Sequence, residues 1–263
     1  MLIIGERINA SRKSILQAIQ ERNTSFIQEE AKRQVESGAQ MLDVNAGVRV
    51  RQEPEDIAWL VRTIQEVVNV PLCIDSPNPL AIEAGLSLHK GRAMVNSITL
   101  EEKRLKGILP LVKQYGSLVV ALTMSENKMP ETAKDRLDIS REIIKIVQKE
   151  NIPLENLYID PLVHPISTDK NNAIIVLESI RMIKETFSVK IITGLSNISF
   201  GLPNRPLINR TFLAMALSAG LDSALIDPLD KEIMATLRAT EALLGQDEYC
   251  LQYLTAFRKG NLG

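Results

Sequence analysis

Short apolar runs rich in β-branched residues alternate with longer amphipathic stretches along the whole of this 263-residue sequence. The amphipathic stretches, in which apolar and charged residues recur at helical spacing, include residues 55–68, 137–150, 174–186 and 231–244. Strands that alternate with helices form parallel sheets, because each helix crosses back over the sheet with the same hand. The eight apolar runs lie at residues 2–4, 41–44, 72–74, 93–95, 118–122, 157–159, 190–193 and 223–226. Eight such units in a chain of this length predict a single (β/α)8 TIM barrel.

The alternative architecture is an open, doubly wound sheet. Its dinucleotide-binding form needs a Gly-x-Gly-x-x-Gly turn after the first strand, and the sequence has no such turn there. No Pro-, Gly- or Ser-rich linker, low-complexity tract or change in composition divides the chain. We therefore expect residues 1–263 to form one domain.

The charge balance and the aromatic content of the chain indicate which classes of partner it can bind. The 31 Lys and Arg residues balance 32 Asp and Glu residues, and aromatic residues make up 4% of the chain. A nucleic-acid-binding protein would need a basic face and usually aromatic stacking side chains, so the sequence predicts no nucleic-acid partner. The start of the chain does not resemble a signal peptide and no window is long and apolar enough for a membrane span, so we expect a cytoplasmic protein with no membrane partner.

The chain has two cysteines, Cys73 and Cys250. They are too few and too far apart for a disulfide framework or for a zinc or iron–sulfur site, so no resident metal is expected. We expect both side chains to be buried as small apolar groups.

The residues that follow the apolar runs are mostly short carboxylates and carboxamides. In a barrel the loops after the strands form one rim, where binding and catalytic residues gather. A carboxylate accepts two parallel hydrogen bonds and a carboxamide both donates and accepts, so this rim suits a flat, nitrogen-rich ring such as the 2-amino-4-oxo edge of a pterin. A phosphate would instead need cations or a glycine nest. The alternative is that these side chains only cap the following helices. The rim residues are Glu6, Asn9, Asn45, Asp75, Asn96, Asp160, Ser196, Asn197 and Asp227.

Several strings of this sequence resemble those of the pterin-binding methyltransferases. They are LIIGERIN at residues 2–9, LDVNAG at 42–47, CIDS at 73–76, AMVNS at 93–97, YIDP at 158–161, GLSN at 194–197 and NRPLINRTFL at 204–213. The resemblance extends from the first residue to about residue 250. Enzymes of this family move a methyl group between N5 of tetrahydrofolate and the cobalt of a corrinoid. More distantly, the chain is similar to dihydropteroate synthase, which shares the barrel and the pterin pocket.

The resemblance implies a role for each rim residue. Asp75, Asn96 and Asp160 would hydrogen-bond the pterin, with Asp160 facing its N–H and amino edge, and Asn197 would lie beside N5 as the catalytic residue. Glu6, Asn9, Asn45, Ser196 and Arg205 complete the predicted substrate-binding set. Arg205 and the nearby Arg210 would either anchor the glutamate tail of folate or structure their loop.

The sequence departs from dihydropteroate synthase at two places. The seventh strand is followed by Ser196-Asn197 with no lysine beside the serine, and no Arg-x-His pattern follows the eighth strand near Asp227. Both features serve the pyrophosphate leaving group of the synthase. Their absence favours a ligand without pyrophosphate.

The family reaction needs a hydrogen-bond donor at N5, because the departing nitrogen would otherwise leave as a strongly basic anion. An Asn197 N–H can supply that bond. The rim has no evident nucleophile, since Cys73 falls within a strand and His89 is expected at a helix end, so we expect direct methyl transfer without a methylated enzyme. His164 follows the sixth strand and is expected to shape that loop. The source of the proton stays open.

The corrinoid is expected to come from a separate protein. Neither histidine of this chain lies in the Asp-x-His-x-x-Gly motif typical of base-off cobalamin proteins. A partner corrinoid protein would dock over the open rim, and the family resemblance also implies a homodimer. The sequence leaves the direction of transfer open. The alternative functions are a dihydropteroate synthase-like condensation of a pterin, or a folate-binding barrel without catalysis that keeps the pterin contacts and does not need Asn197.

Overall fold

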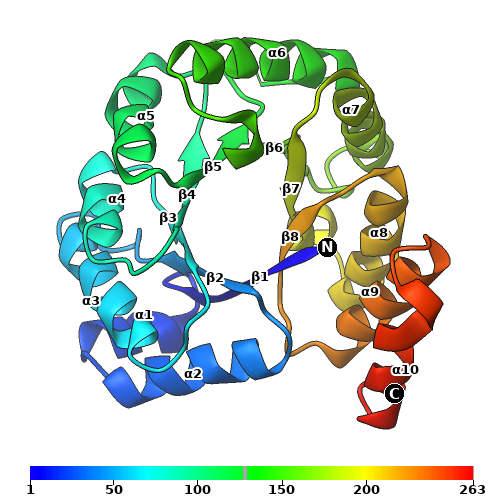
Figure 1. Cartoon of the computed structure of the whole chain (residues 1–263), viewed down its shortest axis with the longest axis horizontal. Coiled ribbons are helices and arrows are strands. Elements are labelled where there is room, and N and C mark those ends of the chain that lie inside the picture. Colours follow the sequence, from blue (N-terminus) through cyan, green and yellow to red (C-terminus); the bar gives the residue numbers. More distant parts are fainter. Residues whose placement is uncertain (127–128, 263) are drawn as a thin grey trace.

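The computed structural model describes residues 1–126 and 129–262 of the chain. Each strand is hydrogen-bonded in parallel to the next, and the last pairs with the first, so the sheet closes into a barrel surrounded by helices (Figure 1). The strands are β1 (Leu2–Asn9), β2 (Met41–Asn45), β3 (Leu72–Asp75), β4 (Met94–Ile98), β5 (Leu118–Leu122), β6 (Leu157–Asp160), β7 (Lys190–Gly194) and β8 (Ser223–Ile226). The expected (β/α)8 barrel is confirmed.

The helices lie outside the barrel and follow the strands in turn. They are α1 (Lys13–Gln20), α2 (Thr24–Glu36), α3 (Glu53–Gln65), α4 (Pro79–Leu86), α5 (Glu102–Tyr115), α6 (Ala133–Lys149), α7 (Asn172–Thr186), α8 (Arg205–Ala219), α9 (Lys231–Leu243) and α10 (Leu251–Arg258). Short 3-10 turns are η1 (Leu154–Asn156), η2 (Leu195–Ser199) and η3 (Glu248–Cys250). In the described ranges, no helix is long and apolar enough to cross a membrane.

The expected strands are all observed, but several are longer than expected. The runs at 118–122 and 223–226 coincide with β5 and β8, whereas β1 ends five residues later than expected, β4 begins one residue later and ends three residues later, and β7 ends one residue later. Strands β2, β3 and β6 also each end one residue later. The added residues are Asn45, Asp75 and Asp160, which still pair with the neighbouring strand through their backbones. These polar side chains therefore stand on the sheet itself and not in the loops after it.

The inside of the barrel changes from apolar to polar along the strand direction. Inward-facing side chains low in the barrel form a buried apolar cluster of Ile4, Met41, Cys73, Met94, Val120, Tyr158 and Ile192. Since side chains on one face of a strand recur every second residue, the residues two positions later face inward as well. Those residues are Glu6, Asp43, Asp75, Asn96, Leu122, Asp160 and Gly194, and all of them line a cavity above the cluster.

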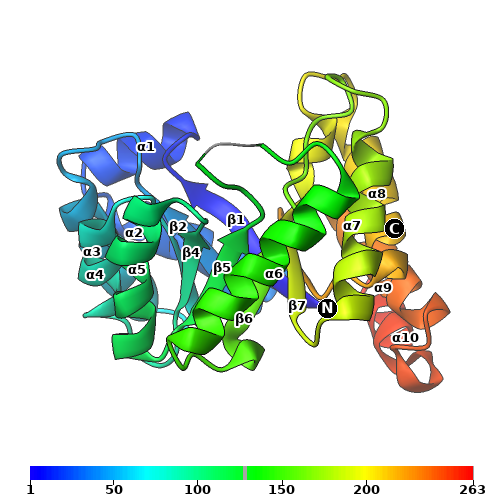
Figure 2. The ribbon, with the colours of Figure 1, turned by 90° about the horizontal axis from the view of Figure 1, so that it is seen from above.

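The last helix, α10, contacts α9 at the edge of the helical ring (Figure 2). None of the α10 residues is buried. Cys250, at the start of this helix, is exposed, so the expectation that it would be buried is wrong. Cys73 is buried in the floor of the barrel as expected, and burial raises the pKa of its thiol well above the usual value.

Candidate active site

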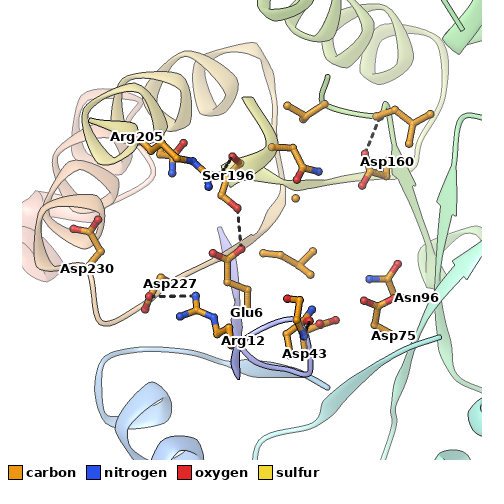
Figure 3. A pocket seen from close by; sticks show the side chains of 18 of the residues that line it. Glu6, Arg12, Asp43, Asp75, Asn96, Asp160, Ser196, Arg205, Asp227 and Asp230 are labelled. Atoms are coloured by element: carbon orange, nitrogen blue, oxygen red, sulfur yellow. Dashed lines mark hydrogen bonds and ion pairs between the residues drawn. The ribbon is translucent and has the colours of Figure 1, made fainter. Parts of the chain in front are cut away.

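A cavity of about 720 Å³ opens at the carboxyl ends of the strands. Every predicted site residue except Asn45 lines it: Glu6, Asn9, Asp75, Asn96, Asp160, Ser196, Asn197 and Arg205. Figure 3 shows Asp75, Asn96 and Asp160 on one side, Arg205, Asp227 and Asp230 on the other, and Glu6 between the two sides. The barrel thus brings together residues from all eight of its strands and from segments that follow them.

The side of the cavity formed by β3 and β4 is built from strand residues. Asp75 and Asn96 stand opposite each other in the register of the two strands. Asn45 lies behind Asp75: its Nδ2 donates to Oδ2 of Asp75 at 2.9 Å, and its Oδ1 accepts from the backbone N–H of Gly47 at 3.0 Å. Asn45 therefore orients the Asp75 carboxylate and does not itself face the cavity.

Asp160 ends β6 on the same side of the cavity. Its Oδ1 accepts from the backbone N–H of Leu162 at 2.8 Å. Burial raises the pKa of Asp160 to about 7, although the N–H groups of Leu162 and Gly194 and the charge of Arg136 oppose that rise. At neutral pH this carboxyl group is therefore divided between its acid and its anion.

Arg136, on α6, holds the loop that follows Asp160. Its side chain is buried, and its Nε donates to the carbonyl of Pro161 at 2.5 Å while Nη2 donates to the carbonyl of Leu162 at 3.4 Å. Burying an arginine is tolerable only where its N–H groups find acceptors, and here the loop carbonyls supply them. The loop in turn delivers the N–H that fixes the Asp160 carboxylate.

Asn197 lies on the turn η2 that follows β7. Its side chain sits against Gly194, where an added Cβ would come within 3.3 Å of Nδ2 of Asn197. The neighbouring Ser196 donates its hydroxyl to Oε2 of Glu6 at 3.3 Å. Arg205, the first residue of α8, donates from Nη2 to the carbonyl of Ser196 at 2.7 Å. This side of the cavity therefore depends on a turn and on the side chains that hold it.

Glu6 occupies the middle of the cavity. Burial raises the pKa of Glu6 to about 7, and the nearby Asp227 adds to the rise while Arg12 opposes it. Asp227 forms ion pairs with Arg7 at 2.7 Å and with Arg12 at 3.7 Å. Asp227 is thus paired with cations, whereas Asp75 and Asp160 face the cavity with hydrogen-bond donors behind them.

Asp43 lines the cavity and was missed by the sequence analysis. Its side chain is 2% exposed, and its Oδ1 has no hydrogen-bond partner in the part of the chain that the structure describes. Burial raises the pKa of Asp43 well above its usual range, and the charge of Asp75 raises it further. The signal lay in the sequence: an acid between Leu42 and Val44, inside an apolar run, two residues before Asn45. The rim residues predicted from the sequence all follow the apolar runs, so they do not include Asp43.

The predicted reaction assigns no catalytic role to the other residues around the cavity. His164 lines the cavity, and burial together with the charge of Arg136 lowers its pKa, which favours the neutral imidazole. Among the described residues, no group of three or more His, Cys, Asp or Glu side chains is arranged to hold a metal ion. Arg12, Asn209 and Asp230 also line the cavity and were not predicted.

Comparisons with known proteins give one matching family and several relatives. The family described as "Pterin binding enzyme" matches residues 5–227. The chain is 36% identical to a methylcorrinoid:tetrahydrofolate methyltransferase of Eubacterium limosum, over all of this chain and 98% of that protein. It is 32% identical to methionine synthase of Mycobacterium tuberculosis over 86% of this chain, and spans only 20% of that longer protein.

Among solved structures, dihydropteroate synthase from Xanthomonas albilineans in complex with 7,8-dihydropteroate matches with a TM-score of 0.72. The match covers 94% of both chains at 18% sequence identity. The synthase from Stenotrophomonas maltophilia matches with a TM-score of 0.70 at 16% identity, covering 94% of this chain and 93% of that one. At these identities the likeness shows a shared fold.

Proposed function

The chain belongs to the pterin-binding enzyme family, and on that premise we propose that it is a methyltransferase acting between N5 of tetrahydrofolate and the cobalt of a corrinoid carried by a separate protein. The observation that carries the proposal is the similarity over the full chain to a methylcorrinoid:tetrahydrofolate methyltransferase. The cavity geometry supports the same function, because carboxylates and carboxamides converge there on one side of an open pocket. Residues 1–263 would form one pterin-binding domain.

The pterin would be held by Asp75, Asn96 and Asp160. The ionised Asp160 carboxylate can accept two parallel hydrogen bonds from N3–H and the 2-amino group of the ring. Asp75 is kept in place by Asn45 and accepts from another ring N–H, and the carboxamide of Asn96 both donates and accepts. Glu6, Asn9, Ser196 and Arg205 would complete the walls around the bound folate.

The methyl transfer would be a direct displacement. In one direction cobalt(I) attacks the methyl carbon, the bond from carbon to N5 breaks, and its electron pair stays on N5, which takes up a proton. In the other direction N5 attacks the methyl carbon, loses its proton, and the electron pair of the broken bond returns to cobalt. Asn197 would donate a hydrogen bond from Nδ2 to N5, which stabilises the charge that develops there.

The same pocket serves both directions, so the partner decides which one is used. A corrinoid protein would dock over the rim so that the cobalt reaches the methyl carbon. The methionine synthases that match this chain are about five times its length, in keeping with a corrinoid carried outside the folate-binding barrel. The homodimeric state and the cytoplasmic location stay predictions, which light scattering and cell fractionation would measure.

Absorption spectroscopy of cobalt tests the proposed reaction. The protein is mixed with cob(I)alamin and 5-methyltetrahydrofolate, and separately with methylcobalamin and tetrahydrofolate, while the cobalt absorption is followed. Free cobalamin replaces the corrinoid protein in both assays. Interconversion of cob(I)alamin and methylcobalamin that depends on enzyme concentration supports the proposal.

Two results would indicate a different function. Folate binding without turnover in either direction, also with a purified corrinoid protein, would indicate a folate-binding barrel without catalysis. Incorporation of para-aminobenzoate into a pterin product would indicate a condensing synthase. Each result is read directly from a separate assay of the same purified protein.

A further inference from the structure

Arg205 directs its guanidinium group toward the turn η2. Its Nε donates to the hydroxyl of Ser199 at 3.0 Å and its Nη2 donates to the carbonyl of Ser196 at 2.7 Å. The guanidinium carbon also lies 5.8 Å from the ring centroid of Phe200, within the range of a cation–π contact. Both hydrogen bonds and the ring contact are made to the segment 195–200.

These bonds occupy one of the edges with which arginine recognises carboxylates. A guanidinium group holds a carboxylate with two parallel hydrogen bonds, and the edge formed by Nε and one Nη is well suited to this. Here that edge is filled by two acceptors of the protein itself, Ser199 and Ser196. The glutamate tail of folate would have to compete with those acceptors for the same edge.

Arg205 reaches the turn because of how α8 begins. Asn204, immediately before the helix, has a left-handed backbone with φ of 46°, and Pro206 follows in the first turn of the helix. The sharp bend at Asn204 and the fixed φ of proline set the direction of the intervening residue. Arg205 thereby ties the start of α8 to the turn η2.

The turn has few other anchors. Ser196 donates to Glu6 at 3.3 Å, and the backbone N–H of Ile166 donates to the carbonyl of Ile198 at 3.0 Å. Asn197 itself is held by its own turn, in which its carbonyl accepts from the N–H of Phe200 at 3.2 Å. Arg205 bonds on both sides of Asn197 in the sequence, at Ser196 and Ser199, so it restrains the backbone that carries the Asn197 side chain.

We propose that Arg205 is a positioning residue that acts through the turn 195–199 to hold Asn197 at N5, and that it is not the anchor of the folate tail. The inference rests on the proposed function, because it assumes that N5 lies beside Asn197. On this proposal Arg205 affects the rate of the methyl-transfer step and not the affinity for folate. A displacement of about 1 Å in a group at the reacting centre costs up to about a hundredfold in rate.

The test separates positioning from tail binding with two substrates. The methyl-transfer rate to cob(I)alamin and the folate Kd are measured for R205A with 5-methyltetrahydrofolate and with a 5-methyltetrahydropterin that lacks the p-aminobenzoyl-glutamate tail. We expect kcat to fall by about 10- to 100-fold with both substrates, while the Kd for 5-methyltetrahydrofolate stays close to that of the wild type.

Arg210 provides a matched control on the same helix. It forms an ion pair with Glu232, and within the described part of the chain it makes no hydrogen bond or ion pair with the turn 195–199. R210A removes the same charge from α8, and we expect it to leave kcat and Kd unchanged. Thermal unfolding of both variants shows whether the barrel remains folded.

Chemical rescue and a double variant distinguish positioning from a general loss of structure. Free guanidinium ion should restore part of kcat to R205A and none to R210A. S199A should lower kcat less than R205A, and the R205A/S199A double variant should be no slower than R205A alone, because both remove the same restraint. If R205A destabilises the barrel, R205K tests the same point, since an ammonium group on a shorter reach cannot satisfy both acceptors.

The outcomes separate the inference from the proposed function. If Arg205 anchors the tail, R205A should bind only the tailed substrate more weakly. A higher Kd of R205A for 5-methyltetrahydrofolate, with an unchanged Kd for the tail-less substrate and an unchanged kcat, would therefore identify Arg205 as the tail anchor and overturn the inference. A wild-type protein that transfers no methyl group, to cob(I)alamin or to a corrinoid protein, would overturn the proposed function instead.

Discussion

The two sides of the cavity are built in different ways. On one side, Asp43, Asp75 and Asn96 are strand residues whose positions are fixed by the hydrogen bonds of the barrel. On the other side, Ser196 and Asn197 stand on a short turn held by Arg205 and Glu6. A strand residue keeps its place as long as the barrel is folded, whereas a turn residue depends on a few side-chain contacts.

This difference in construction is consistent with separate roles for the two sides of the cavity. The strand side would hold the pterin, a task that needs rigid, complementary hydrogen-bonding groups. The turn side would carry the single group that responds to charge at N5, where small displacements change the rate more than the affinity. Variants on the two sides should therefore separate cleanly into binding defects and rate defects.

The largest effect is expected for Asp160. D160A removes the two charge-assisted hydrogen bonds that we propose to the pterin, and we expect the Kd for 5-methyltetrahydrofolate to rise by close to a thousandfold, about 4 kcal/mol. Isothermal titration calorimetry measures this change. D230N is the control, since it removes a charge from the same cavity while its remaining oxygen can still cap α9. A Kd for D160A within a few-fold of the wild type would show that the pterin does not use this side.

Asn197 should show the opposite behaviour. N197A removes the proposed donor to N5, and we expect kcat for methyl transfer to fall by about a hundredfold, on the order of 3 kcal/mol, while the folate Kd changes little. Single-turnover measurement of cobalt absorption separates the chemical step from binding. If N197A weakened binding and left the single-turnover rate intact, the assignment of the two sides would have to be reversed.

Much of the strand side could be predicted from the sequence, and the reason is geometric. The inward direction repeats every second residue, so Asp75, Asn96 and Asp160 are placed by the apolar residues two positions before them. The same rule would have found Asp43, had it been applied inside the run and not only after it.

The turn side was less accessible to sequence analysis. Asn197 could be assigned by family resemblance, but the contacts that hold it depend on the bend at Asn204 and on where α8 begins. The sequence left open whether Arg205 binds a ligand or structures its loop, because both roles use the same residue type at the same place. The structure shows which acceptors the guanidinium group contacts, Ser196 and Ser199.

The pH dependence of binding should report on the strand side. Burial raises the pKa of Asp160 to about 7. Only the ionised form can accept the two hydrogen bonds that we propose from the N–H groups of the pterin. The affinity for 5-methyltetrahydrofolate should therefore increase as the pH rises from 6 to 8, by about tenfold, and then level off. Calorimetry in buffers of different ionisation enthalpy should detect proton release on binding.

Glu6 also has a pKa raised to about 7, so its contribution has to be separated. In D160N the pH dependence between 6 and 8 should largely disappear, whereas in E6Q it should remain. Affinity that increases toward acid pH in the wild type would contradict the assignment of Asp160 as the anionic acceptor.

The smallest effect is expected for Gly194. Its backbone, with φ of −76° and ψ of 93°, accommodates alanine, but the new Cβ would lie 3.3 Å from Nδ2 of Asn197. We expect G194A to push the Asn197 side chain by a few tenths of an ångström and to lower kcat several-fold, at the mild end of the range for small displacements of a reacting group. Binding and thermal stability should stay near wild type. An unchanged kcat would show that the position of Asn197 is less critical than proposed.

A crystal structure of the complex with 5-methyltetrahydrofolate tests the central claim most directly. We expect the pterin edge to lie within hydrogen-bond distance of Asp75, Asn96 and Asp160, and N5 to face the Nδ2 atom of Asn197 with its methyl group toward the open rim. A pterin bound elsewhere on the chain, or one whose N5 points away from the turn 195–199, would contradict this claim.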